Sequence, residues 1–247
     1  MTESISSTSP ISSVSSAGAR FKDLEPVDKQ RFRYLIADDH PSVTFALGQL
    51  LAEVIGAPPS QCSTFAGSAE LLDACTGPST EVRVVVLDLV MPGTVKRAKL
   101  VQALLRADPD ARVLVYTADE SAFLAKAVID AGAMGYVAKT SPAAELMEAI
   151  VAVCGGQRHL DGCIDLQSIQ SHSWASLTEA EKAVLLALCR GEKAQEIVSR
   201  TGRSYSTVTT HKYNGLRKLG LRDGSDLLPY LYTNGLLYEL DGDPGCW

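Results

Sequence analysis

Short apolar runs alternate with longer amphipathic stretches between residues 32 and 156. Five runs are typical of buried strands, since they are short and bounded by polar or turn residues: 32–37, 61–66, 82–88, 111–117 and 135–139. Helical spacing of apolar residues follows each of them, over 42–56, 68–76, 99–107, 121–132 and 142–156. This alternation predicts an α/β fold with a doubly wound, five-stranded parallel sheet.

From Trp174 onward the helical patterns continue and the strand-like runs stop. Helices are predicted over 178–190, 193–202, 204–220 and 225–237. Thr178 and Glu181 have the spacing of a capping box at the start of the first of these. The pattern predicts a second, smaller all-α domain. The boundaries we predict are a disordered tail at 1–30, the α/β domain at 31–156, a linker at 157–173, the all-α domain at 174–238 and a tail at 239–247.

The net charge at first argues against DNA as a partner. The 247 residues carry 23 basic and 29 acidic side chains, a net charge of −6, whereas nucleic-acid binding usually needs a basic surface. The average conceals a local excess. Residues 174–222 hold nine basic and four acidic residues, and residues 223–247 hold five acidic residues and no basic one. The all-α domain is therefore the basic part of an acidic chain.

The sequence predicts no membrane or secretory segment. No stretch approaches the roughly 18–20 apolar residues of a membrane span, and the first residues lack the basic start and apolar run of a secretory signal. The six cysteines are scattered without a C-x-x-C pair, which is typical of reduced thiols rather than of disulfides or zinc ligands. We therefore expect a cytoplasmic protein that contacts no membrane.

Polar side chains end four of the predicted strands: Asp38 and Asp39 the first, Asp88 the third, Thr117 the fourth and Lys139 the fifth. The carboxyl ends of parallel strands share one edge of the sheet, where ligands bind. Converging carboxylates need a cation, and oxygen ligands beside phosphate chemistry select Mg²⁺. One carboxylate can then attack a phosphoryl group whose oxygens the lysine and threonine contact. Each residue alone is more often an ordinary loop residue, but the ordered set is far more specific.

The ordered set resembles the receiver domain of bacterial two-component response regulators. The motifs that carry the resemblance are LIADDHP, VVVLDLVMPG, VYTAD and GYVAKTS, and it covers roughly residues 32–155. It implies a flavodoxin-like fold in which Asp88 is the phosphoacceptor. It also implies that Asp38, Asp39, Asp88 and the backbone carbonyl of Val90 hold Mg²⁺.

The same resemblance implies a switch. Thr117 would be the switch hydroxyl, Lys139 the phosphate-binding lysine and Tyr136 the switch aromatic, with an ordinary strand aromatic as the alternative for Tyr136. Two departures from the family stand beside the phosphoacceptor. Gly93 follows Met-Pro at once and leads into the basic sequence TVKRAK, and Val90 cannot hydrogen-bond an attacking water through its side chain. We therefore expect an atypical loop and slow self-dephosphorylation.

The basic domain contains two helices with the spacing of a helix-turn-helix, 193–202 and 204–219, and Gly202 suits the turn between them. The second helix combines hydroxyls, an amide and cations, which phosphate contacts and base readout use. The alternative is the solvated face of a plain helical bundle. The DNA-contacting residues that we predict are Lys193, Ser206, Thr207, Thr209, Thr210, Lys212, Tyr213 and Arg217.

This region resembles the LuxR-type helix-turn-helix that follows a receiver in NarL/FixJ regulators, over about residues 175–237. Its polar face resembles the branch of the Rcs capsule phosphorelay regulator. The family often has lysines where Gln195 and Thr209 stand, so the phosphate contacts would shift to Lys193, Lys212 or Arg217. By the same resemblance, the helix predicted at its C-terminal end would dimerise the domain.

The two resemblances together imply a phosphorylation-dependent transcriptional regulator and not an enzyme. A sensor histidine kinase or phosphotransfer protein would phosphorylate Asp88, and the protein would bind DNA as a homodimer, or as a heterodimer with an auxiliary regulator. One alternative is a regulator that acts largely without phosphorylation, through an auxiliary protein partner. Another is a phosphatase or related hydrolase, which needs an acid–base carboxylate where this chain has Val90.

Overall fold

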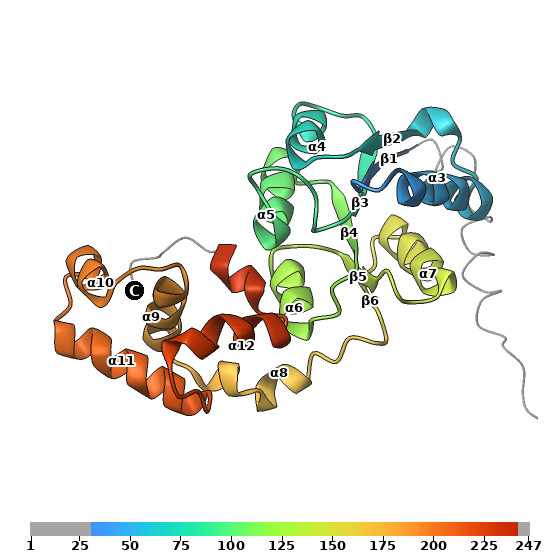
Figure 1. Cartoon of the computed structure of the whole chain (residues 1–247). Helices are drawn as coiled ribbons and strands as arrows, with labels where there is room; N and C mark the ends of the chain where they lie inside the picture. Colours follow the sequence, from blue (N-terminus) through green and yellow to red (C-terminus); the bar gives the residue numbers. More distant parts are fainter. Residues whose placement is uncertain (1–30, 242–247) are drawn as a thin grey trace, which may run out of the picture.

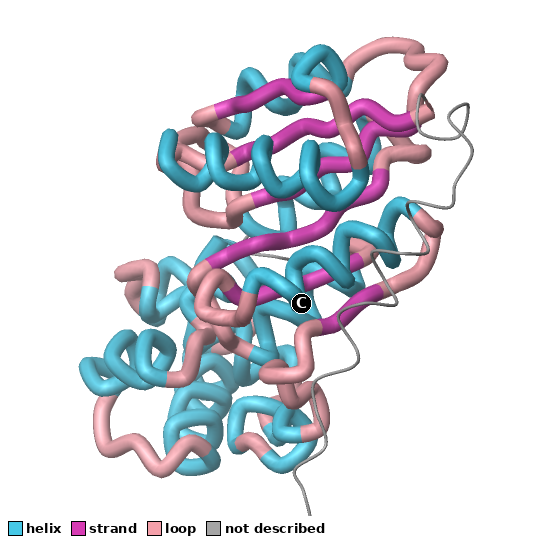
Figure 2. Tube along the Cα trace, turned by 90° about the vertical axis from the view of Figure 1, so that its right-hand side faces the viewer, coloured by secondary structure: helices cyan, strands magenta, loops and turns pink. Residues whose placement is uncertain are grey.

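The computed structural model describes residues 31–241, so the tail predicted at 1–30 lies outside the described residues, as do residues 242–247. The first domain is a parallel sheet with helices on both faces (Figures 1 and 2). Its strands, in chain order, are β1 (Phe32–Ala37), β2 (Cys62–Phe65), β3 (Val82–Leu87), β4 (Arg112–Thr117), β5 (Gly135–Ala138) and β6 (His159–Leu160). Its helices are α3 (Pro41–Ile55), α4 (Ser68–Cys75), α5 (Arg97–Ala107), α6 (Ala122–Asp130) and α7 (Ala143–Cys154), and η1 (Pro59–Gln61) is a 3-10 turn.

The doubly wound parallel sheet is confirmed, but the prediction of five strands was wrong. The order is β2-β1-β3-β4-β5-β6, and the sixth strand lies in the segment predicted as a linker. His159 N donates to Met134 O, and Asp161 N donates to Tyr136 O, both at 2.9 Å. Without β6, these two carbonyls on the outer side of β5 would have no backbone hydrogen-bond partner. Two residues are too short for a strand pattern to show in the sequence.

Both faces of the sheet are buried, which explains why the strands are apolar at nearly every position. Leu35 and Ala37 of β1 pack toward α4, α5 and α6, whereas Tyr34 and Ile36 pack toward α3 and α7. The helices therefore leave only the ends of the sheet open, and the strands' carboxyl ends present their polar residues there.

The second domain is helical, as predicted. Its elements are η2 (Ser173–Ser176), α9 (Glu179–Cys189), α10 (Ala194–Thr201), α11 (Tyr205–Lys218), η3 (Gly224–Asp226), α12 (Leu227–Thr233) and η4 (Leu237–Asp241), and α8 (Ser168–Ser171) precedes it. Trp174 is 1% exposed at the centre of its apolar core. Gly202 has a φ of 68° at the end of α10, and Ser204 caps α11 by accepting a hydrogen bond from Thr207 N. These residues form the sharp turn of a helix-turn-helix.

Residues 239–241, which belong to the tail predicted at 239–247, form part of the 3-10 helix η4, and the rest of that prediction lies outside the described residues. Glu239 accepts a hydrogen bond from the indole Nε1 of Trp174 at 3.2 Å, and the Arg190 guanidinium donates to the carbonyls of Glu239 and Leu240. These contacts hold residues 239–241 in η4. The sequence does not reveal them because each joins residues about 50 or more positions apart.

The two domains meet on the α5 and α6 side of the sheet (Figure 1). Tyr238 of η4 packs against the apolar cores of both domains. Ser121 Oγ donates to Gly235 O at 2.9 Å, and Arg97 forms an ion pair with Asp241. The ring of Phe123 makes an edge contact with His172, with centroids 4.9 Å apart. The basic TVKRAK segment thus contacts the acidic C-terminal segment through Arg97.

Among the helices of residues 31–241, none is both long and apolar enough to cross a lipid bilayer.

A buried ion pair fixes α11 against α9. Lys218 Nζ lies 2.7 Å from Glu181 Oε2, and the Glu181 side chain is only 6% exposed. The same carboxylate accepts from Thr178 N, which confirms the predicted capping box. Burial opposes the ionisation of Glu181, but the hydrogen bonds from Lys218 and Thr178 outweigh it and lower the pKa.

We predict that Glu181→Ala lowers the free energy of unfolding of the second domain by about 2 kcal/mol at neutral pH, because it removes a cap and a buried charge partner. Since the pKa is lowered in the folded state, this contribution is complete above the ordinary pKa of glutamate and is lost as pH falls through the lowered value. Urea unfolding monitored by Trp174 fluorescence measures it. Glu179→Ala is the control: that side chain is 84% exposed and pairs with Lys182 at the surface. Equal losses in the two variants would contradict the prediction.

Candidate functional site

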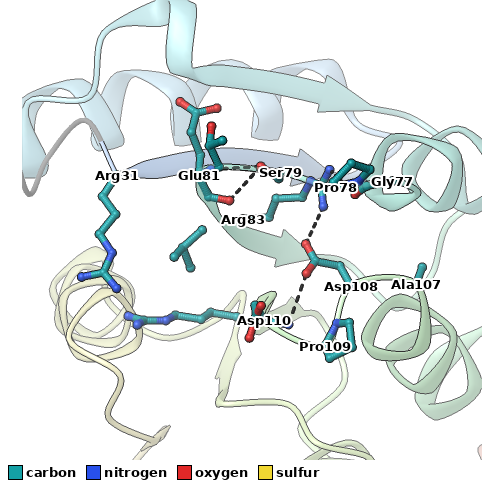
Figure 3. Close-up of a pocket in the computed structure, with 13 residues that line it drawn as sticks. Arg31, Gly77, Pro78, Ser79, Glu81, Arg83, Ala107, Asp108, Pro109 and Asp110 are labelled. Carbon is teal, nitrogen blue, oxygen red and sulfur yellow. Dashed lines mark hydrogen bonds and ion pairs between the residues drawn. The ribbon is translucent and has the colours of Figure 1, made fainter.

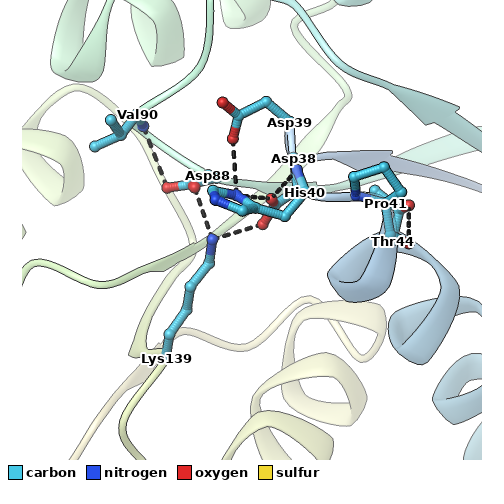
Figure 4. Close-up of polar contacts among 8 residues, drawn as sticks. All are labelled: Asp38, Asp39, His40, Pro41, Thr44, Asp88, Val90 and Lys139. Atoms are coloured by element: carbon cyan, nitrogen blue, oxygen red, sulfur yellow. Dashed lines mark hydrogen bonds and ion pairs between the residues drawn. The ribbon is translucent and has the colours of Figure 1, made fainter.

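The carboxyl ends of β1, β3 and β5 bring three charged side chains together (Figure 4). Asp38 follows β1 and is 3% exposed, and Asp88 follows β3 and is 4% exposed. Lys139 follows β5, and its Nζ lies 2.6 Å from Asp38 Oδ2 and 2.7 Å from Asp88 Oδ2. One ammonium therefore bridges two buried carboxylates, and the pocket keeps an excess of negative charge.

Burial would lower the pKa of Lys139, but its close contacts with the negative charges of Asp38 and Asp88 outweigh burial and raise it. The rim of the pocket adds Asp39, whose side chain is 33% exposed, and His40. His40 Nδ1 lies 2.9 Å from Asp39 Oδ1 and 3.0 Å from Asp38 Oδ1. The pocket therefore holds three carboxylates and gathers basic groups around them.

The acidic residues of this pocket fit a magnesium ion. Asp38, Asp39, His40 and Asp88 each offer a ligand atom within 4.8 Å of the others. Asp38 Oδ2 and Asp39 Oδ1 are buried and accept no hydrogen bond, although Lys139 and His40 lie within ion-pair distance of them. Carboxylate oxygens with free lone pairs are what Mg²⁺ binds. The three aspartates of the predicted ligand set therefore lie close enough together for one divalent ion to fit between them.

Thr117 and Tyr136 lie on the strands next to the pocket. Thr117 ends β4, is fully buried, and its Oγ1 has no hydrogen-bond partner. Its carbonyl accepts from Lys139 N at 2.7 Å, so the two predicted site residues are joined through the backbone. Tyr136 is fully buried on β5, and its hydroxyl donates to Asp119 O at 2.5 Å. Burial raises the pKa of Tyr136, so the hydroxyl stays protonated.

The predicted DNA-contacting residues lie together on α11, except Lys193, which caps α10. Val208 and Leu216 face the core and leave the polar side outward. Tyr213 is 63% exposed. All the predicted residues on α11 are exposed or half-exposed, namely Ser206, Thr207, Thr209, Thr210, Lys212, Tyr213 and Arg217. The hydroxyls of Thr209 and Thr210 donate back to helix carbonyls, which leaves their oxygens free only as acceptors.

Comparison with known proteins agrees with both halves of this geometry. Residues 34–151 match the family described as response regulator receiver domain, and residues 175–231 match the LuxR family of bacterial regulatory proteins. The chain is a two-component response regulator of the NarL/FixJ type. Regulators of this kind control transcription and are not enzymes.

Several relatives share both domains of this response regulator. The response regulator GacA of Pseudomonas aeruginosa is 28% identical over 83% of this chain and 97% of its own length. The response regulator UvrY of Escherichia coli is 26% identical over 82% of this chain and 94% of its own. The structure of RcsB from Salmonella enterica serovar Typhimurium, solved bound to promoter rprA in the presence of phosphomimetic BeF3−, is 26% identical. It covers 81% of this chain and 97% of its own, with a TM-score of 0.56.

Gly93 of this response regulator has a structural reason. Its φ is 141°, and a Cβ there would lie 1.9 Å from Ser68 Oγ at the start of α4. Only glycine lets the loop after Asp88 pass so close to that helix. The departure from the family's usual loop is therefore a packing requirement.

A second pocket of the response regulator lies at the opposite edge of the sheet (Figure 3). This cavity of about 700 Å³ is lined by the segments that precede β3 and β4, and it includes none of the predicted site residues. Arg83 lines it and donates to Asp108 at 2.6 Å and to the carbonyls of Cys75 and Gly77 at the end of α4. These are the contacts of a helix cap and not of a binding site.

Proposed function

We propose that this response regulator accepts a phosphoryl group on Asp88 from a sensor histidine kinase or phosphotransfer protein and then controls transcription as a DNA-bound dimer. The observation that carries the proposal is the Lys139 ammonium between Asp38 and Asp88, beside buried carboxylate oxygens without hydrogen bonds. Such a pocket is preorganised for added negative charge on Asp88 and for a divalent cation.

In the transfer, a carboxylate oxygen of Asp88 forms a bond to phosphorus, and the bond from phosphorus to the donor atom breaks. The donor keeps that electron pair. Asp38, Asp39 and Asp88, with the carbonyl of Val90, would hold Mg²⁺, which when bound neutralises charge on the phosphoryl oxygens. Lys139 neutralises a further oxygen without moving far, since its Nζ already lies 2.7 Å from Asp88.

The switch residues carry this event to the second domain. Thr117 has a buried hydroxyl without a partner, which can donate to a phosphoryl oxygen. A shift of Thr117 disturbs the loop after β4, where Tyr136 bonds Asp119 O and Asp119 accepts from Ser121 N. Because Ser121 also donates to Gly235 O, phosphorylation would weaken the contact between the domains.

Release of the second domain would free its dimerising and DNA-binding faces. Leu228 and Tyr232 of α12 are 49% and 74% exposed one helical turn apart, which suits the proposed dimer contact. Lys193, Lys212 and Arg217 would contact phosphates, and the polar residues of α11 would read base edges. A DNA target also places this function in the cytoplasm. The DNA-bound structure of RcsB supports the proposal by similarity.

Incubating the whole protein with acetyl phosphate and Mg²⁺ tests the first step. We expect an increase in intact mass equal to one phosphoryl group, and we expect EDTA to suppress it. If circular dichroism shows that the protein is folded but its intact mass does not increase, the proposal is contradicted. DNA binding that is equally tight with and without the phosphoryl group would also contradict it, and would favour a regulator that acts through a protein partner.

We further predict that the phosphorylated protein loses its phosphoryl group slowly, over minutes or longer. Val90 is 60% exposed beside Asp88 and offers no side-chain hydrogen bond to an attacking water. Val90→Glu supplies one and should shorten the half-life about tenfold or more, whereas Val90→Ala should leave it within about twofold. Decay of the intact mass over time measures it. A wild-type half-life of seconds is the result that would count against this prediction.

A further inference from the structure

Asp161 is a buried carboxylate outside the predicted phosphorylation site. It directly follows β6 and is 3% exposed. Its backbone N donates to Tyr136 O at 2.9 Å, which continues the pairing of β6 with β5. Its Oδ1 accepts from Cys163 N at 3.0 Å. A buried carboxylate costs free energy unless it is well hydrogen-bonded, so its contacts indicate what it is for.

The other oxygen of Asp161 holds both ends of one turn. Oδ2 accepts from Ala138 N at 3.0 Å and from Ser141 Oγ at 2.5 Å. Ser141 N in turn donates to Ala138 O at 3.0 Å, which closes the turn. The residue that follows Ala138 in this turn is Lys139. The backbone that carries the lysine is therefore held between Asp161 on one side and the carbonyl of Thr117 on the other.

The position of Lys139 Nζ depends on this backbone, because the side chain reaches from the turn to Asp88 at 2.7 Å. Ala138 is fully buried, so loss of Asp161 would remove a hydrogen bond from a buried N–H. Burial opposes ionisation of Asp161, but the hydrogen bonds from Cys163, Ser141 and Ala138 outweigh it and lower its pKa. The group is thus a fixed anion that can only accept.

We propose that Asp161 is a positioning residue for the phosphorylation site, which fixes the turn so that Lys139 Nζ lies against Asp88. The inference rests on the proposed function of Asp88 and Lys139. Through Asp161, the segment between the domains would directly affect the geometry of the site, because Asp161 belongs to that segment and not to the strands that carry the site residues.

A double-mutant cycle in the whole protein tests it, with the rate of phosphorylation by acetyl phosphate and Mg²⁺ as readout. A displaced lysine should cost about tenfold or more in rate, so Asp161→Ala should slow the reaction by that factor. In the Lys139→Ala background the same change should have almost no further effect, since the group that it positions is gone. Asp161→Asn keeps the side-chain volume but loses part of the acceptor capacity, so its phosphorylation rate should lie between those of wild type and Asp161→Ala.

The control is Asp165→Ala in the same segment. Asp165 accepts from Gln167 N at 2.9 Å in an exposed local turn and makes no contact with β5 among its hydrogen bonds. It should leave the rate unchanged. Thermal unfolding shows whether each variant is folded, and Asp161→Asn serves if Asp161→Ala is not.

The possible results distinguish a failure of the positioning role of Asp161 from a failure of the proposed function of Asp88. Normal rates in both Asp161 variants would overturn the positioning role. An equal slowing by Asp161→Ala with and without Lys139 would also overturn it, because that is the effect of general loosening. If wild type takes up no phosphoryl group, the proposed function itself fails. A wild type that reacts and a Lys139→Ala variant that reacts slowly keep the proposed function, whatever Asp161 does.

Discussion

We expect Asp88→Asn to leave this response regulator unable to take up a phosphoryl group from acetyl phosphate in the presence of Mg²⁺. The amide is almost the same shape as the carboxylate but is a far weaker nucleophile. It also removes one of the two carboxylates that contact Lys139, which lies 2.7 Å away. Intact-mass measurement should show no increase under conditions that fully modify wild type.

The free energy of unfolding of the variant shows whether the loss of the reaction comes from the missing carboxylate or from unfolding. Asp88→Asn relieves repulsion among three acidic residues, so the variant should be at least as stable as wild type. Asp73→Asn is the matched control, because Asp73 is an exposed carboxylate on α4 and should leave the reaction unchanged. A mass increase in Asp88→Asn equal to that of wild type would mean that the phosphoryl group goes elsewhere.

Replacing both Lys212 and Arg217 by alanine should lower DNA affinity about a hundredfold at moderate salt. Each removes a charged phosphate contact, worth about 1.4 kcal/mol or tenfold in affinity. Both lie on α11 in the second domain, and Arg217 is exposed. Each phosphate contact releases counterions from DNA when the protein binds. Because the double variant makes two fewer contacts, the slope of log affinity against log salt should fall by about 2.

Titration of labelled duplex at several salt concentrations measures both effects. Lys126→Ala is the control, since this exposed lysine of α6 lies in the other domain and pairs with Asp130 at 2.7 Å. It should change neither affinity nor slope. A loss of affinity with an unchanged slope would show that Lys212 and Arg217 support the helix and do not contact phosphates.

The sequence predicted that most residues of the proposed phosphorylation pocket lie together, because they directly follow strong strand patterns. The run from Val84 to Leu87 is completely buried in β3, so the next residue, Asp88, necessarily lies at the edge of the sheet. Asp38 and Lys139 follow β1 and β5 in the same way. Parallel strands bring these ends together without any further information about side-chain contacts.

The same reasoning could not find Asp161 or the docking of η4. Asp161 follows a strand of two residues, too short for a period, and its side-chain hydrogen bonds to Ser141 and Ala138 reach back 20 and 23 positions. Tyr238 joins two cores that the sequence treats as separate domains. Local pattern does not encode such long-range contacts. His40 had a local signal, since it adjoins two aspartates, but its ring contact with them depends on a side-chain rotamer.

We propose that phosphorylation of Asp88 controls DNA binding by the second domain. The most direct test measures the affinity of the whole protein for a duplex selected in vitro with the phosphorylated protein, at one fixed salt concentration, with and without acetyl phosphate and Mg²⁺. We expect phosphorylation to tighten DNA binding by wild type about tenfold or more and to leave binding by Asp88→Asn unchanged. Equal binding by both states of wild type, or the same gain in Asp88→Asn, would contradict it.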